Sequence, residues 1–313
     1  MKTVLTRSVN EAASFIRRGS IVAFPTETVY GLGANVFDEA AIKKIFDAKD
    51  RPADNPLIAH VSSVDQIDEL AREITPHARS LMAAFFPGPL TLVLPKSQLV
   101  PKTATAGLDT IGIRMPGSGL AREFLNACRV PLVAPSANLS GRPSPTTWQA
   151  VFEDLDGRVD CILQGDPTEI GLESTVVDCT AEPPVLLRKG AVSVEQLREV
   201  VPGIRTAGPD DAQTPRSPGL KHRHYSPRAR VVVITGDPRI SPGDDDAIIG
   251  ITPPVSEFKF SMICASIDEY AGALFEFFRE CDRRGIKTIF CQSVPDAGIG
   301  AALMDRLRRA SEG

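Results

Sequence analysis

Amphipathic stretches alternate with short apolar runs over the first two hundred residues of the chain. Within residues 10–18 the apolar positions recur at the helical spacing, and Gly19 ends this stretch before an apolar run at 21–24 that predicts a β-strand. A second helix is predicted to begin after Asp38, a favourable N-cap residue, and to end just before Lys49.

The same patterns predict the other elements of an α/β domain with a twisted, mixed sheet. Further strands are expected at 90–94, 111–114, 132–134, 161–163, 175–178 and 185–187. Helices are expected around Leu81, Leu125, Trp148 and Leu197.

A change of composition between Pro202 and Pro227 predicts an interdomain linker, because proline, glycine, aspartate and serine crowd together there with several cations. Beyond it, strands of a second α/β unit are predicted at 230–235, 247–251, 262–265 and 288–291. The last helix should run from about 299 to 309.

One helix of the second unit carries an apolar stripe, which we interpret as core rather than as a groove for a partner. Its members are Ala271, Leu274, Phe275, Phe278 and Cys281. We therefore predict a catalytic α/β domain at 1–205, a linker at 206–229 and a smaller, Rossmann-like α/β domain at 230–313.

Length and composition agree with two domains. The chain has 313 residues and is 42% hydrophobic. A chain of this length is longer than a single hydrophobic core usually serves. A net charge of -4 and a pI near 5.7 argue against a surface built to coat nucleic acid, although a local basic patch stays possible.

The six cysteines show no C-x-x-C pairing, which fits reduced thiols in the cytosol and no cysteine-based metal site. Residues 1–10 lack the apolar region of a signal peptide, and no apolar run approaches the ~20 residues of a membrane span. We expect a soluble, cytoplasmic protein that does not contact the membrane.

The candidate chemistry lies in polar stretches punctuated by glycine and proline at 24–60 and 134–146. They place a threonine pair, a Lys-x-Arg and a Ser-x-Asn beside short apolar strands, as a site for an anionic substrate requires. The chain contains neither a P-loop nor a complete dinucleotide fingerprint, so a nucleotide would bind by another architecture.

Paired cations at a helix-to-loop junction can hold phosphate, and Lys49 and Arg51 with Asn55 supply such a group. Ser136 and Asn138 supply hydroxyl and amide donors. The alternative for the two cations is a solvated helix end, and the alternative for the Ser-x-Asn is turn chemistry.

Three further residues have two interpretations each. His60 follows an apolar run and could be a semi-buried structural histidine or a substrate contact. Arg114 and Arg188, at strand ends, could be surface cations or anion ligands. His222 and His224 could share one strand face, but no nearby residue completes a metal set, so we predict no metal site there.

Several motifs together resemble the YrdC-type domain of threonylcarbamoyl-AMP synthases. They are PTETVYGLG, KDRPADNPL, TIGIRMP, APSANLSG, ESTVVD and LRKG, in this order over roughly the first two hundred residues. The linker SPGLKHRHYSP and the terminal GIGAALMDRLRRA resemble the long, two-domain form of that family. Departures at Leu220, His222 and Ser226 affect linker detail only.

The resemblance implies a nucleotidyltransferase that joins L-threonine, bicarbonate and ATP into threonylcarbamoyl-AMP and releases pyrophosphate. A partner complex would then transfer the threonylcarbamoyl group to the adenosine beside the tRNA anticodon, and this chain would contact tRNA weakly at most. Mg²⁺ would arrive with ATP, because no dedicated carboxylate cage is visible.

The resemblance also implies site residues. Threonine would be held by Thr28, His60, Arg114, Ser174 and backbone groups near Ala134. The nucleotide would be surrounded by Lys49, Arg51, Asn55, Thr110, Ser136, Asn138, Ser144 and Arg188, with Tyr225 of the linker closing over it. Lys49 and Arg51 would be the catalytic cations.

Two other functions are left open by the sequence. One is an RNA-binding module without ATP turnover, which the basic residues of the linker favour and the acidic pI opposes. The other is a carbamoyl-transfer enzyme with a different acceptor, as in hydrogenase maturation, although those proteins carry additional segments and a zinc finger that the cysteine spacing here does not supply.

Overall fold

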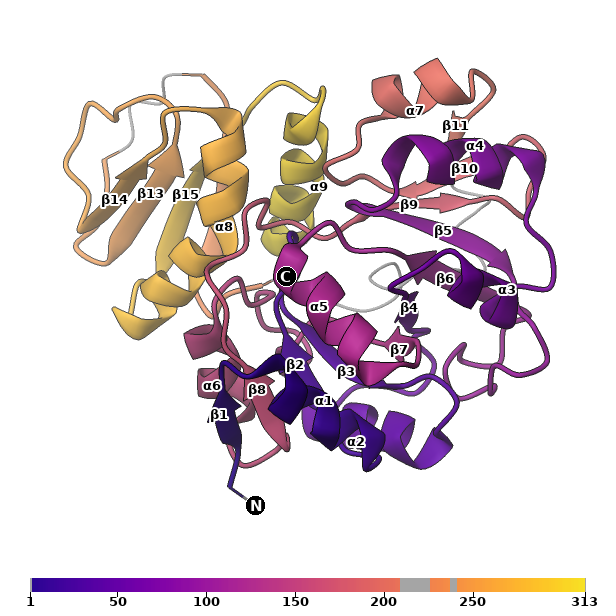
Figure 1. Ribbon diagram of the computed structural model, residues 1–313. Helices are drawn as coiled ribbons and strands as arrows, with labels where there is room; N and C mark the ends of the chain where they lie inside the picture. The colour runs from indigo at the N-terminus through magenta and orange to yellow at the C-terminus, as the bar shows by residue number, and fades with distance from the viewer. Residues whose placement is uncertain (1, 209–225, 237–240, 313) are drawn as a thin grey trace.

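The computed structural model describes residues 2–208, 226–236 and 241–312, which fold into two α/β units (Figure 1). The larger unit contains a sheet with both parallel and antiparallel neighbours, which confirms the predicted mixed sheet. In hydrogen-bonding order its strands are β1 (Val4–Thr6), β8 (Cys161–Leu163), β2 (Val22–Phe24), β3 (Gly31–Asn35), β7 (Leu132–Val133), β4 (Ile58–His60), β6 (Thr110–Arg114), β5 (Leu90–Pro95), β9 (Thr175–Asp178), β10 (Val185–Arg188) and β11 (Arg205–Thr206).

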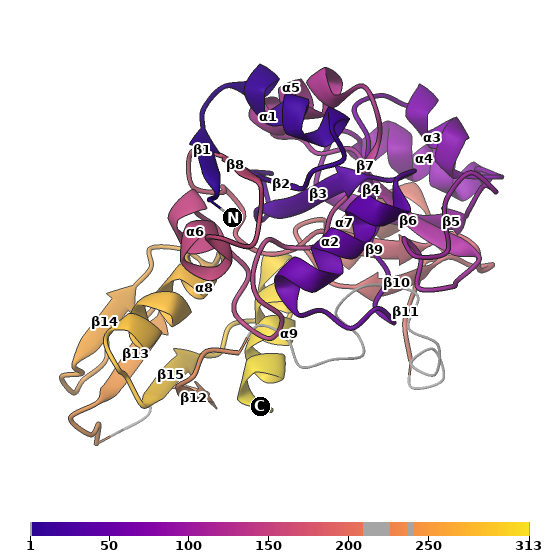
Figure 2. The same ribbon diagram turned by 90° about the horizontal axis from the view of Figure 1, so that it is seen from below.

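Helices cover both faces of this sheet. They are α1 (Val9–Arg17), α2 (Glu39–Lys49), α3 (Asp65–Leu70), α4 (Pro76–Phe85), α5 (Gly119–Cys128), α6 (Trp148–Leu155) and α7 (Val194–Val200). Because side chains alternate along a strand, Val22 and Phe24 pack with α1 and α5, whereas Ala23 packs in the core that includes α2. Figure 2 shows α1 and α5 on one side of β2 and β3, and α2 on the other.

Local caps fix the ends of α2. The Asp38 carboxylate accepts the backbone N–H groups of Ala40 and Ala41, each at 3.0 Å. Asp50 adopts a left-handed conformation with φ of 51° and ends the helix. Lys49 is therefore the last helical residue, one position later than predicted, and the chain turns directly after it.

Strand β3 was not predicted, because its sequence GLGAN carries no alternating apolar pattern. The fold requires small residues there: a Cβ at Gly33 would lie 3.0 Å from Phe24 Cε1 and 3.2 Å from Leu132 Cδ1. The short elements β1, β4, β11 and α3 were also not predicted.

The second unit has its own parallel sheet, with strand order β12 (Arg230–Ile234), β15 (Thr288–Gln292), β13 (Asp246–Gly250) and β14 (Phe260–Ile263). Helices α8 (Ile267–Arg283) and α9 (Ile299–Ser311) lie on the side of this sheet that faces the larger unit (Figure 1). The strands predicted for this unit are confirmed to within two residues at either end.

The apolar stripe of α8 is buried core, as predicted. Val29 and Leu172 of the larger unit belong to the same apolar cluster, so the two units share a packed interface. The predicted linker lies mostly outside the described residues. Among the helices of the described ranges, none is both long and apolar enough to cross a bilayer.

Candidate active site

An open cleft, whose space of about 650 Å³ includes the adjoining solvent, lies against strands β4 and β6 and the residues that directly follow β7. The parallel strands β4 and β6 both end beside it, so that His60 and Arg114 are neighbours in register. The predicted site residues that line the cleft are Thr28, Arg51, His60, Arg114, Ala134, Ser136, Asn138, Ser144, Ser174 and Arg188. The fold thus gathers in one place residues that are far apart in the sequence.

Arg114 is 4% exposed and lines the cleft. Its Nη1 donates to Thr28 Oγ1 at 2.8 Å, and its Nη2 lies 2.6 Å from Glu27 Oε1. Burial acts to raise the pKa of Glu27, but the charge and hydrogen bond of Arg114 outweigh it and hold that pKa below its usual value. Nε of Arg114 is buried and has no hydrogen-bond partner within the described residues.

Sequence reasoning missed Glu27. The signal that could have found it is its position between Thr26 and Thr28, in a polar stretch that directly follows a buried strand. A buried carboxylate needs a cationic partner, and Arg114 was already a predicted site residue that could supply the charge.

His60 is buried against the ring of Phe24, with ring centroids 5.9 Å apart in an edge-on arrangement. Burial, and then the charge of Arg114, lower the pKa of His60 to about 3, so the imidazole is neutral at pH 7. Its Nδ1 lies 3.1 Å from the carbonyl oxygen of Ile58, which can only accept. The proton is therefore on Nδ1, and Nε2 is an acceptor.

The threonine pair is ordered by its own hydrogen bonds. Thr26 Oγ1 donates to the carbonyl of Val29 at 2.7 Å and lies 2.9 Å from Thr28 Oγ1. Since the Thr26 proton is already used, the Thr28 hydroxyl donates to Thr26 while it accepts from Arg114. Both hydroxyls line the cleft in fixed orientations.

Ser174 and Arg188, predicted for different substrates, contact each other. Arg188 Nη2 donates to Ser174 Oγ at 3.1 Å, and its Nε donates to the Ser174 carbonyl at 2.9 Å. Ser174 Oγ also lies 2.7 Å from Thr91 Oγ1. The two predicted subsites are therefore continuous at this point of the wall.

Lys49 does not line the cleft. Its Nζ donates to the carbonyl of Ser136 at 2.6 Å and to that of Asn138. Burial, and next the charge of Arg51, hold the pKa of Lys49 well below its ordinary value. The structure thus places Lys49 behind the wall, where it supports the segment that carries Ser136 and Asn138.

Further hydroxyl and amide groups line the cleft. Ser136 Oγ donates to Asn138 Oδ1 at 2.6 Å, and Asn138 Nδ2 donates to the carbonyl of Arg142 at 2.9 Å. Ser144 Oγ donates to Glu173 Oε1 at 2.5 Å. Arg142 and Glu173 also line the cleft and were not predicted; the charged partner of Glu173, Arg306, is 133 residues away in the chain.

Besides Lys49, two predicted residues of the described ranges are not on the cleft wall. Thr110 begins β6 whereas Arg114 ends it, so four residues of strand rise, roughly 13 Å, separate them. Asn55 is buried and does not line the cleft. The carbonyl oxygen of Asn55 lies 3.4 Å from Arg51 Nη2. Tyr225 lies outside the described residues.

The charge of the cleft favours an anionic ligand. Its described lining includes the four arginines Arg51, Arg114, Arg142 and Arg188 and one carboxylate, Glu173. Within the described ranges, no group of three histidine, cysteine, aspartate or glutamate side chains is arranged to hold a metal ion.

Comparisons with known proteins match nearly the whole chain. A family model described as "Telomere recombination" matches residues 14–190, and one described as "Threonylcarbamoyl-AMP synthase, C-terminal domain" matches residues 192–312. The threonylcarbamoyl-AMP synthase of Pyrococcus abyssi is 45% identical over 96% of this chain and 93% of its own length. That of Bacillus subtilis is 40% identical over 97% of this chain and 93% of its own.

A solved structure of P. abyssi Sua5 complexed with L-threonine superposes with a TM-score of 0.91. It is 43% identical and covers 99% of this chain and 97% of that one. With both family models matched in order and relatives similar from end to end, the chain belongs to the two-domain threonylcarbamoyl-AMP synthase family.

Proposed function

We propose that this chain synthesises L-threonylcarbamoyl-AMP from L-threonine, bicarbonate and ATP and releases pyrophosphate. The observation that carries the proposal is a single cleft with four arginines on its wall, in which a buried arginine is surrounded by hydroxyls and a neutral imidazole. Membership of the family, and a relative whose structure holds L-threonine, support the same reaction.

Threonine binds at the Arg114 end in this proposal. The guanidinium pairs with the substrate carboxylate, because the side chain lines the cleft and its planar fork matches a carboxylate. Thr28, His60 Nε2 and the Ser174 hydroxyl offer groups for the amine and hydroxyl of threonine, and backbone groups at Ala134 complete this end. Glu27 fixes Arg114 before the substrate arrives.

The nucleotide occupies the other end, with Arg51 and Arg188 as the cations closest to its phosphates in the proposal. Ser136, Asn138 and Ser144 supply hydrogen bonds there. Lys49 contributes by holding the Ser136 and Asn138 carbonyls, rather than by direct contact.

The reaction brings two anions together. The threonine amine and bicarbonate form a carbamate and water; a carbamate oxygen then attacks the α-phosphorus while the bond to the β-phosphate oxygen breaks. The arginines offset the repulsion of the approaching anions and the charge that moves onto pyrophosphate. Because a carbamate oxygen is already a nucleophile, the step does not require a general base.

Mg²⁺ is proposed to enter with ATP. The described residues fit an ion held by phosphate oxygens and not a resident one, because the carboxylate of Glu173 is engaged by Ser144 and Arg306. When bound, the ion would offset charge on the phosphates.

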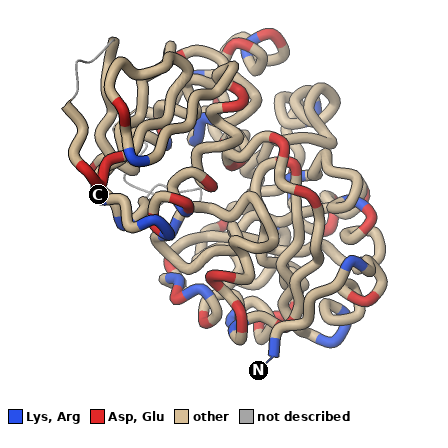
Figure 3. Tube along the Cα trace, turned by 90° about the vertical axis from the view of Figure 1, so that its left-hand side faces the viewer, with Lys and Arg blue, Asp and Glu red and all other residues tan. Residues whose placement is uncertain are grey.

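The product is proposed to pass to an enzyme complex that modifies the adenosine next to the tRNA anticodon. Figure 3 shows basic and acidic residues interspersed along the described chain in both units, an arrangement that favours weak tRNA contact at most. A cytoplasmic location is proposed because all six cysteines are buried, free thiols, as in a reducing compartment.

Pyrophosphate release from purified protein tests the reaction. Protein is incubated with ATP, Mg²⁺, bicarbonate and L-threonine, and each component is omitted in turn. Release that needs both threonine and bicarbonate is the expected result. Release without threonine would indicate another acceptor or ATP hydrolysis, and tight RNA binding without turnover would favour a binding module; either result overturns the proposal.

A further inference from the structure

Two arginines of the second unit are buried against the first unit. Arg279 of α8 is 4% exposed, and Arg306 of α9 is completely buried. Arginine is almost never fully buried without a partner, since a guanidinium loses a large hydration free energy. Each of the two has a carboxylate partner in the first unit.

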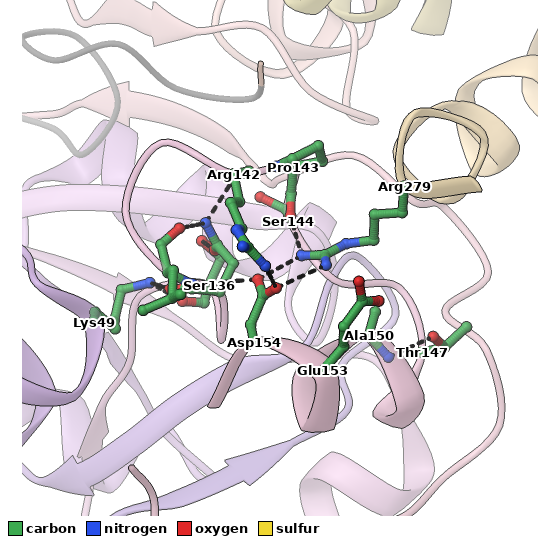
Figure 4. A network of polar contacts seen from close by, with 12 residues as sticks. Lys49, Ser136, Arg142, Pro143, Ser144, Thr147, Ala150, Glu153, Asp154 and Arg279 are labelled. Carbon is green, nitrogen blue, oxygen red and sulfur yellow. Dashed lines mark hydrogen bonds and ion pairs between the residues drawn. The ribbon is translucent and has the colours of Figure 1, made fainter. Parts of the chain in front are cut away.

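Arg279 binds Asp154 of α6 with both terminal nitrogens, at 3.1 Å and 2.8 Å (Figure 4). Its Nη2 also donates to the carbonyl of Pro143 at 2.5 Å. Asp154 in turn accepts from Arg142 Nη1 at 2.7 Å and from the backbone N–H of Leu139 at 3.3 Å. Arg279 thus reaches three points of one loop, one directly and two through Asp154.

Arg306 reaches the same loop through Glu173. Its Nε donates to Glu173 Oε2 at 2.9 Å, and its Nη2 donates to the carbonyl of Lys189 at 3.1 Å. The other oxygen of Glu173 accepts from Ser144 Oγ at 2.5 Å. The charge of Arg306 is also the largest of the influences that lower the pKa of Glu173 against the effect of burial.

Both routes end on residues 138–144, which we name the clamp loop. Asn138, Arg142 and Ser144 of this loop line the cleft. We propose that the second unit fixes the clamp loop in the conformation that binds the nucleotide, with Arg279 and Arg306 as positioning residues. The inference rests on the proposed function for the identity of the nucleotide as ATP.

The physical reason lies in the clamp loop itself. It belongs to no helix or strand, so holding it still costs conformational entropy. A loop ordered before the ligand arrives spares that cost at binding, and the gain appears as affinity. Loss of Arg279 would leave the Pro143 carbonyl without its hydrogen bond. Asp154 would then pair only with Arg142, which is partly exposed.

The test is Arg279→Met with Arg283→Met as its matched control. Arg283 lies on the same helix and also faces the first unit, 3.4 Å from Glu153, but it is 39% exposed and is not bonded to the clamp loop. For Arg279→Met we expect the KM and the calorimetric Kd for ATP to rise about tenfold, as loss of a charge-assisted hydrogen bond implies, with the KM for threonine unchanged. Arg283→Met should leave all three constants as in the unmodified protein.

Arg306→Met and its control on α9, Arg308→Met, repeat the comparison for the second contact with the loop. Arg308 is 54% exposed and pairs with Asp296 only at the surface. Equal losses for ATP and threonine, or an unchanged ATP affinity in a folded Arg279 variant, would overturn the inference. A purely structural role would lower stability without separating the two substrates.

Conservative variants keep the test open if a Met variant does not fold. Arg279→Lys retains the charge for Asp154, but a single ammonium cannot span both Asp154 and the Pro143 carbonyl. We expect the ATP affinity of Arg279→Lys to lie below that of the unmodified protein but above that of Arg279→Met. An ATP affinity equal to that of the unmodified protein, or no higher than that of a folded Met variant, would count against the clamp. ATP binding is measured without turnover, so a protein that binds ATP but makes no threonylcarbamoyl-AMP overturns the proposed function alone.

Discussion

The guanidinium of Arg114 and the carboxylate of Glu27 form a buried ion pair, with Nη2 2.6 Å from Oε1. Glu27 precedes Thr28 in the chain, and Thr28 accepts from the same guanidinium. One short segment therefore supplies both the counter-charge and a hydrogen-bond acceptor that orient Arg114. The arginine is held in position before any substrate carboxylate reaches it.

Arg114→Ala should weaken threonine binding more than ATP binding. A lost charge-assisted pair costs roughly 1.5–3 kcal/mol, which corresponds to about ten- to a hundredfold in Kd. Calorimetric titration of each substrate measures the two effects. Arg122→Ala, at an exposed position of α5, is the control; an Arg114 variant with normal threonine affinity would remove this residue from the threonine subsite.

Glu27→Gln should lower stability at pH 7 by roughly 1–3 kcal/mol, because Arg114 loses its buried counter-charge. The pKa of Glu27 is lowered from 4.5 by folding, so its contribution is fully present above that value and is lost as the pH falls through the folded pKa. Urea unfolding at pH 7 and at pH 4 measures this: the difference between variant and unmodified protein should shrink at the lower pH.

His60 should stay neutral throughout the physiological range. Folding lowers its pKa from 6.5 to about 3. The contribution of the neutral His60 ring to stability is therefore fully present above pH 6.5 and is lost as the pH falls toward 3, because the unfolded chain takes up the proton first. NMR of ¹⁵N-histidine protein, with His60→Gln to identify the signal, should show an Nδ1-protonated neutral ring at pH 5. A ring that titrates near pH 6.5 would contradict the burial described here.

Lys49→Met separates a supporting role from direct catalysis. The substitution keeps the apolar stem but leaves the Ser136 and Asn138 carbonyls without their donor, at a cost of roughly 1–3 kcal/mol for each unsatisfied group. We expect a lower melting temperature together with weaker ATP binding. Unchanged stability with a large loss of kcat would instead assign Lys49 a direct contact with the reacting phosphate.

Gly33→Ala should destabilise the large sheet by roughly 1–3 kcal/mol, the usual effect of overpacking a core. The added Cβ would meet the Phe24 ring at 3.0 Å and Leu132 at 3.2 Å. Gly119→Ala is the control, because nothing lies within 4 Å of a Cβ at that position. Chemical unfolding measures the free energy of unfolding of both variants. Equal values would show that the Phe24 and Leu132 side chains shift to accommodate the added methyl group.

Most elements could be predicted because their signals are local. The stripe of α8 and the strand at 161–163 follow from the spacing of apolar residues, and Asp38 marks the start of α2. Strand β3 could not be predicted, since its two glycines reflect the close packing of the Phe24 ring and Leu132 and not any periodicity. The candidate cations and hydroxyls were found because their motifs flank strands.

The sequence by itself determined the two-unit α/β architecture, the family, and which polar segments carry the chemistry, because these depend on local patterns and on motifs read in order. Only the tertiary structure decided that Thr110 lies away from the cleft and that Lys49 stands behind its wall. It alone paired Asp154 with Arg279 and Glu173 with Arg306, across 125 and 133 residues. A charge that is removed from water is stable only beside a counter-charge, so burial in the fold decides which of these residues pair. Their spacing along the chain does not indicate the pairing.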